Sequence, residues 1–361
     1  MFKKISEGDV FIANDVIVRS SGSRTAVLPD GKLICSFMSN SASGVNNFIP
    51  WVCYSEDNGE SWSEPVCLWK DYVVGKHSVF GSVRNTLDGR ICYCGSSTPI
   101  AYDGQKFWSN EIGGMLENKL VFSISNDGYN FPEFTEVDLP YYGAAELPGG
   151  MLVDKDGTIM ILYSPYRTIE QKEDTKVNQM VIVRSEDNGK TFTPYVVGED
   201  KEPCQYGEAW LVKLSNGNHF ISTWQTAVQV NTDRYLLSFD NAKTFTKPIP
   251  LPFNGQSTSC TPYKDGKVFV IYNQRKEEPK GVWLAIGKPD EKGFNMIANE
   301  PIWKAEKATR SGSSGEFDNW TDFAFGEPHL SILPDGKLLC TIWYDSGNKK
   351  GIRYVKLEIE E

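Results

Sequence analysis

Four charged residues stand in short stretches that otherwise carry the small and apolar residues of buried strands: Arg24, Glu146, Glu208 and Glu327. Hydrolysis of a glycosidic bond needs two carboxyl groups, one protonated to donate to the leaving oxygen and one ionised to act as nucleophile or base. In a pocket of low dielectric, neighbouring carboxyl groups push their pKa values apart, and an arginine lowers the nearer one. We therefore predict that Glu208 forms such a catalytic pair with Glu146 or Glu327.

Other residues near these four could take part. His329 follows Glu327 by two residues, which predicts that both point to the same face of one strand, where the imidazole could move a proton or only hydrogen-bond. The Arg24 guanidinium suits a carboxylate or vicinal hydroxyls. Further substrate-binding candidates are His77, Arg84, Tyr206 and Trp210. Each candidate also has a structural interpretation, because arginines can tie elements together, glutamates can be solvated at a channel end and rings can pack in a core.

A turn motif that recurs four times indicates which elements position these residues. It occupies residues 55–62, 125–131, 185–192 and 238–245, and each copy follows an apolar alternating run. Its Asp and Asn side chains can bond nearby backbone N–H groups, its glycine supplies a positive φ, and an aromatic residue closes it. The copies therefore predict hairpins in a repeated structural unit.

A second motif, an Asp-Gly or Asn-Gly turn followed by an apolar strand, gives the period of this unit. It begins at Asp30, Asp88, Asp156, Asn216, Asp265 and Asp335, an average interval of about 61 residues. Six units of four strands predict an all-β fold, a six-bladed β-propeller with four-stranded antiparallel blades. We expect one domain over residues 1–361, closed by a strand at about residues 9–19. Two β-sandwiches are the competing architecture, but no linker breaks the period.

Composition and charge exclude several classes of function. The net charge of −10 argues against general nucleic-acid binding, which needs a basic face. The first residues lack the apolar run of a signal peptide, and no stretch has the roughly 18 apolar residues of a membrane span, so we expect a cytoplasmic protein without a membrane partner. The eight cysteines show no CxxC spacing, which predicts reduced core thiols, no zinc site and no cofactor.

The turn motif that recurs four times is similar to the Asp box of the sialidase superfamily, whose members are six-bladed propellers. Together with the six-unit period, the Asp-box motif gives a resemblance to this superfamily that covers nearly the whole chain. In sialidases three arginines hold the substrate carboxylate, an Asp is the acid/base, and a Tyr assisted by a Glu is the nucleophile. By this resemblance Arg24 corresponds to the first arginine, Arg234 to the second, Arg275 to the third and Glu208 to the assisting Glu. The resemblance also implies a carbohydrate as the binding partner.

Two family residues are missing from their expected places. Residues 40–50, where the acid/base Asp would lie, contain no acidic residue, and Phe325 stands where the last inner strand should offer a Tyr. We therefore predict an exo-acting glycoside hydrolase for a terminal sugar, acidic sugars included, that uses paired Glu residues instead. The alternatives are a non-catalytic carbohydrate-binding propeller and a lyase or isomerase on an acidic sugar, with His329 or a Glu as base.

Overall fold

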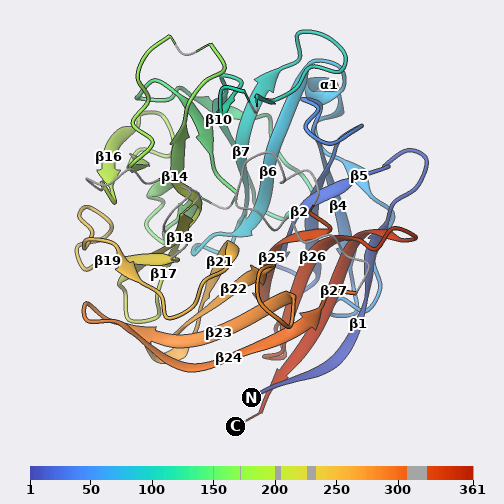
Figure 1. The fold of residues 1–361 in the computed structure, drawn as a ribbon, viewed down its shortest axis with the longest axis vertical. Coiled ribbons are helices and arrows are strands. Elements are labelled where there is room, and N and C mark those ends of the chain that lie inside the picture. The colour runs from blue at the N-terminus through green and yellow to red at the C-terminus, as the bar shows by residue number, and fades with distance from the viewer. Residues whose placement is uncertain are drawn as a thin grey trace.

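The computed structural model describes residues 1–109, 111–148, 150–170, 172–199, 205–225, 233–306 and 323–360. Within these ranges the strands form six antiparallel blades that follow one another around a central axis (Figure 1). The predicted all-β, six-bladed propeller with four-stranded blades is confirmed. The helical segments of the described chain are the single turns α1 (Lys70–Val73) and η1 (Lys264–Gly266), and none has the length and hydropathy of a membrane span.

The first three blades occupy the N-terminal half of the chain. Blade 1 consists of β2 (Ser20–Val27), β3 (Leu33–Ser39), β4 (Ile49–Ser55) and β5 (Val66–Cys67). Blade 2 consists of β6 (His77–Asn85), β7 (Ile91–Pro99), β10 (Lys119–Ser125) and β11 (Thr135–Val137), with the small hairpin β8 (Trp108–Ser109) and β9 (Gly114–Met115) in its long loop. Blade 3 consists of β12 (Ala144–Glu146) and β13 (Met151–Val153), which both pair with β14 (Ile159–Tyr166), then β15 (Met180–Ser185) and β16 (Thr193–Val197).

The last three blades complete the ring. Blade 4 consists of β17 (Tyr206–Lys213), β18 (His219–Gln225), β19 (Arg234–Ser238) and β20 (Ile249–Pro250). Blade 5 consists of β21 (Gln256–Pro262), β22 (Val268–Gln274), β23 (Gly281–Pro289) and β24 (Phe294–Lys304). Blade 6 consists of β25 (Phe325–Ile332), β26 (Leu338–Asp345), β27 (Lys350–Ile359) and β1 (Phe2–Ile12).

The strand that closes the ring is β1, which pairs antiparallel with β27 from Phe2 opposite Ile359 to Ile12 opposite Gly351. It lies earlier than the expected residues 9–19. The strand ends where it does because Asn14 Oδ1 accepts the backbone N–H groups of Val16 and Ile17 at 2.9 and 2.8 Å, an Asx turn that offers the backbone an alternative to the sheet.

The four Asp-box motifs form the turns that their sequence predicted. In the first, Asp57 Oδ1 accepts the N–H groups of Glu60 and Ser61 at 3.0 and 2.9 Å, and Asn58 and Gly59 adopt φ values of 57° and 86°. The same Asp-to-backbone bonds recur at Asp127, Asp187 and Asp240. Each box follows the third strand of its blade, so these turns lie at the outer part of the ring.

Each pair of neighbouring blades buries its own hydrophobic cluster, including the pair that joins the two ends of the chain. Between blades 1 and 6, for example, Phe37 of β3 packs with Ile352 of β27 and stacks on Phe11 of β1 at 5.1 Å between ring centroids. The described cysteines are all unpaired, and most of them lie in these clusters as small apolar residues. The core therefore lies between the blades and leaves the inner strands free to build a site.

Candidate active site

The inner strands of blades 1, 4, 5 and 6 carry a β-bulge at the same position. Their register shifts fall at residues 21–24, 207–210, 256–259 and 326–329. One residue of each bulge has left-handed backbone geometry: Gly22 (φ 64°), Glu208 (φ 45°), Ser257 (φ 52°) and Glu327 (φ 48°). A residue other than glycine costs about 1–3 kcal/mol in this region, and such strain is concentrated at functional sites.

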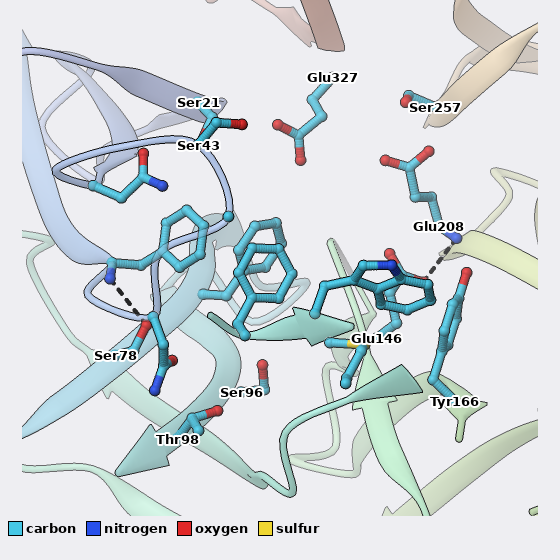
Figure 2. A pocket seen from close by; sticks show the side chains of 18 of the residues that line it. Ser21, Ser43, Ser78, Ser96, Thr98, Glu146, Tyr166, Glu208, Ser257 and Glu327 are labelled. Atoms are coloured by element: carbon cyan, nitrogen blue, oxygen red, sulfur yellow. Dashed lines mark hydrogen bonds between the residues drawn. The ribbon is translucent and has the colours of Figure 1, made fainter. Parts of the chain in front are cut away.

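The bulges direct their side chains into a cavity of about 340 Å³ at the end of the channel. Its lining includes Glu208, Ser257 and Glu327 from three bulges, with Glu146 of blade 3 and Arg275, which directly follows β22 of blade 5. Figure 2 shows the Glu208 and Glu327 carboxyl groups turned toward the same space, with Ser257 beside Glu208. The structure therefore brings all three predicted glutamates and one predicted arginine to one cavity.

Glu327 is held by blade 1. Its Oε2 accepts the backbone N–H of Gly22 at 2.8 Å, and its main-chain carbonyl accepts Arg24 Nη1 at 2.7 Å. Gly22 has a φ of 64°, the left-handed region that favours glycine. Arg24 is buried below the carboxylate and outside the cavity lining, where its charge still stabilises a negative charge on Glu327.

Glu208 lies among several hydrogen-bond donors. Trp224 Nε1 donates to its Oε2 at 2.6 Å, and Ser257 lies beside the same carboxyl group (Figure 2). Burial and the charge of Glu327 raise the pKa of Glu208 above its usual value, against the opposing effect of Ser257, Arg275 and Trp224. Glu208 thus keeps its proton to higher pH than an exposed glutamate.

Glu146 supports Glu208 through the backbone. Its Oε2 accepts the N–H of Glu208 at 2.8 Å, the bond drawn dashed between Glu208 and Glu146 in Figure 2. Burial and then the Glu208 charge raise the pKa of Glu146 well above its usual value, although the N–H bond opposes this. A neutral Glu146 can accept this bond without placing a third charge in the cavity, and the bond stabilises the left-handed backbone at Glu208.

Arg275 borders the cavity but is firmly tied to the protein. Nη1 donates to Gln256 Oε1 at 3.0 Å, Nη2 donates to the carbonyl of Phe325, and the guanidinium lies 3.8 Å from the centroid of the Phe323 ring. Burial lowers its pKa to about 10, against the effect of Glu208 and Glu327. Arg275 is therefore a fixed cation at neutral pH, beside two carboxyl groups.

Beneath the cavity the channel is filled by a packed cluster around Trp210. The guanidinium carbons of Arg84 and Arg24 lie 4.7 and 5.3 Å from its ring, and the His329 ring lies at 5.4 Å. Arg84 donates to the carbonyls of Met151 and Leu211, which ties blades 2, 3 and 4 together. The predicted binding residues Arg24, Arg84 and Trp210 are absent from the cavity lining. Their contacts are those of arginines that tie elements together and of a ring that packs in a core.

His329 does not share a face with Glu327, so that prediction is wrong. The bulge between Gly326 and His329 changes the alternation of side chains, and His329 points away from the cavity into the Trp210 cluster. Its Nδ1 accepts the N–H of Thr25 at 3.3 Å. Burial and the two nearby arginines lower the pKa of His329 well below its usual value, which keeps the ring neutral.

The remaining predicted residues lie elsewhere. His77 stacks on Tyr72 of α1, with 4.3 Å between the ring centroids. Tyr206 is fully buried in the cluster between blades 3 and 4, and Arg234 begins the third strand of blade 4. None of the three is in the cavity lining. Phe325 is also fully buried, in the cluster between blades 5 and 6.

Sequence reasoning missed several residues that line the cavity: Gln256, Ser257, Trp224, Trp343, Phe48, Phe80 and Phe107. A signal was present for two of them. Glu208, Ser257 and Glu327 each stand eight residues before the Asp or Asn of their turn motif, and Phe80 has the same spacing in blade 2. Because the blades repeat, this shared spacing marks one height on the inner strands. Over the described residues, no group of His, Cys, Asp and Glu side chains is arranged to hold a metal ion.

Comparison with solved structures identifies the class of fold. A protein of unknown function from Dyadobacter fermentans has a TM-score of 0.72 at 16% identity and matches over 99% of both chains. The NanB sialidase from Streptococcus pneumoniae has a TM-score of 0.65 at 13% identity, covering 97% of this chain and 70% of that one. The intramolecular trans-sialidase from Ruminococcus gnavus has a TM-score of 0.63 at 13% identity over 97% of both chains.

This chain is a sialidase-like six-bladed β-propeller, as its turn motifs predicted. At these identities the likeness concerns the fold, and the chemistry must be argued from the cavity. The sequence matches no protein-family model and no curated protein.

Proposed function

We propose that the protein is a glycoside hydrolase that acts on a terminal sugar with Glu208 and Glu327 as its catalytic carboxyl groups. The observation that carries this proposal is the pair itself: two carboxyl groups on strained bulges of blades 4 and 6 border one cavity in unlike surroundings. Glycosidases need such a difference, because one carboxyl group donates a proton while the other is ionised. Glu146 is a positioning residue in this scheme.

Glu208 is the proposed general acid. Burial and the charge of Glu327 raise its pKa, so the proton remains available for the glycosidic oxygen. The hydrogen bond from Trp224 fixes the carboxyl group, and Trp224 and Ser257 both favour the carboxylate that remains after the proton has left. The proton goes to the leaving group, and the carboxylate then takes one back from the incoming water.

Glu327 is the proposed nucleophile or base. The Gly22 N–H bond and the nearby charges of Arg24 and Arg275 stabilise its carboxylate. From this position it either attacks the anomeric carbon or takes a proton from a water that does so. His329 is not available as a base, because it is buried in the Trp210 cluster outside the cavity.

The sugar is proposed to be a terminal unit. A cavity of about 340 Å³ lies at the small end of the range for ligand pockets, about 300–1,000 Å³. Solved neighbours include sialidases, one bound to oseltamivir carboxylate and another to 2,7-anhydro-Neu5Ac. Arg19 and Arg275 line the same cavity as the glutamates, so acidic as well as neutral sugars are candidate substrates.

The test is a panel of dinitrophenyl and methyl glycosides, including sialosides and uronides, given to the wild type, Glu208→Gln and Glu327→Gln. The exposed Glu291→Gln is the matched control, expected to behave as the wild type. Loss of the acid should slow methyl glycosides by about 10²–10⁴-fold and dinitrophenyl glycosides much less, because a good leaving group needs little protonation. Loss of Glu327 should slow both.

Other results would favour the alternatives. Binding of a sugar without turnover by the wild type supports a non-catalytic carbohydrate-binding propeller. An unsaturated product that absorbs in the ultraviolet supports a lyase. Either result contradicts the hydrolase assignment.

A further inference from the structure

The cavity has a second side of different chemistry. Glu208, Ser257 and Glu327 come from blades 4, 5 and 6, whereas blade 2 and its long loop supply Ser78, Phe80, Ser96, Thr98, Phe107, Trp108, Met115, Leu116 and Asn118. The second group contains no charged side chain. Figure 2 shows aromatic rings between Ser78, Ser96 and Thr98 on one side and the glutamates on the other.

Three rings form the wall of this second side. The Phe48 centroid lies 5.3 Å from that of Phe80 and 5.4 Å from that of Phe107, both edge to face. We call Phe48, Phe80 and Phe107 the phenylalanine wall. Their rings come from three separate segments, namely the residue before β4, the inner strand β6 and the loop before β8.

The phenylalanine wall is held by the backbone. The Phe48 N–H donates to Ser78 Oγ at 2.9 Å, and the Phe107 N–H donates to the carbonyl of Gly44 at 3.0 Å. An antiparallel bridge between Val45 and Lys106 joins the two loops further. A wall fixed in this way can bind a ring without ordering its own loops first, which favours affinity.

We infer that the phenylalanine wall is the subsite for an uncharged aromatic aglycone attached to the sugar held by the glutamates. This inference rests on the proposed function. An aromatic ring adds to edge-to-face pairs and brings no polar group of its own to desolvate, whereas a charged group would lose its hydration against this wall. Thr98 and Leu116 also border a separate hollow of about 150 Å³.

The test measures binding, so that it does not depend on turnover. Phenyl and methyl 1-thioglycosides of each panel sugar, which resist hydrolysis, are titrated by calorimetry against the wild type and Phe107→Leu. Phenol alone is the second probe, observed by NMR. The control is Phe239→Ala, because Phe239 is 56% exposed in the Asp-box turn of blade 4. We expect the phenyl form to bind up to about tenfold more tightly than the methyl form, and expect Phe107→Leu to remove most of that preference.

The outcomes separate this inference from the proposed function. Equal affinity of both forms, or a preference that survives in Phe107→Leu with the fold intact by circular dichroism, overturns the aromatic subsite and leaves the hydrolase standing. A Phe107-dependent phenyl preference without turnover of the corresponding O-glycosides supports the subsite and contradicts the hydrolase. If no sugar binds, Phe107-dependent binding of phenol supports an aromatic site alone, and its absence overturns the inference.

Discussion

The backbone N–H of Glu208 donates a 2.8 Å hydrogen bond to Oε2 of Glu146, so two carboxyl-bearing residues of neighbouring blades are joined through the main chain of one and the side chain of the other. The bond reaches Glu208 at its left-handed position, φ 45°. The bond fixes the direction in which the Glu208 side chain leaves the strand. Glu146 therefore influences the chemistry indirectly, by positioning Glu208.

Replacement of Glu146 separates a positioning role from a catalytic one. Glu146→Gln keeps an oxygen acceptor for the Glu208 N–H and should retain most of kcat, while Glu146→Ala loses the acceptor and should lower kcat up to about 10²-fold, as a small displacement of a catalytic group can. Steady-state kinetics and circular dichroism check this. If Glu146→Gln is as inactive as Glu208→Gln, then Glu146 is itself a catalytic residue.

The pH profile of kcat/KM should depend on Glu208. Burial and the Glu327 charge raise its pKa, so the active, protonated form persists above the usual range for a glutamate. The rate should then fall by about tenfold per pH unit once the pH exceeds that raised pKa. On dinitrophenyl substrates, Glu208→Gln should remove this alkaline limb. A limb that is unchanged in Glu208→Gln assigns the proton to another group.

The Asp boxes should contribute to stability and not to activity. The Thr244 side chain and backbone hold the pKa of Asp240 down at about 2. Because the folded pKa is depressed, this stabilisation is present above the unfolded pKa of about 3.9 and is lost as the pH falls toward 2.

Asp240→Asn should accordingly lower the melting temperature by a few degrees at pH 7, with a smaller difference from wild type at pH 3. The exposed Asp15→Asn provides the control. Thermal melts at the two pH values give the comparison, and unchanged melting of Asp240→Asn would contradict the assigned role of the turn.

Restoring the tyrosine of sialidases should not restore their chemistry. Phe325 is fully buried against Trp303 at 5.4 Å between ring centroids. The hydroxyl in Phe325→Tyr would lie in this core, at a cost of about 1–3 kcal/mol if it finds no partner. We expect a lower melting temperature and no gain in sialoside hydrolysis. A gain in that activity would show that this side chain can reach the substrate.

The fold could be predicted because its signals are local. The bonds that make an Asp box run from Asp57 to residues within four positions, and the same short pattern recurs in four blades. The closing strand was predicted too late in the sequence because the Asn14 turn, which ends β1, was not recognised.

The site was predictable only in part. Glu146, Glu208 and Glu327 could be predicted because each is a charge on an inner strand, and all three line the cavity. The bulges, however, decide which neighbours accompany them: Ser257 enters the cavity, while Arg24 and His329 lie below it. Bulge geometry depends on pairing with β3, β22 and β26, which the strand patterns alone do not encode. The phenylalanine wall is assembled from three separate segments, and of its residues only Phe80 has the spacing that the blades share.

The pairing of β1 with β27 has a consequence for biosynthesis. Figure 1 shows the two termini side by side, although Phe2 and Ile359 come from opposite ends of the sequence. A ribosome makes β1 long before its partner exists, so blade 6 can be completed only after β27 has been made. Until then, β1 exposes an unpaired edge that invites intermolecular association. Yield in expression should therefore respond to temperature and chaperone supply more strongly than the stability of the finished ring would suggest.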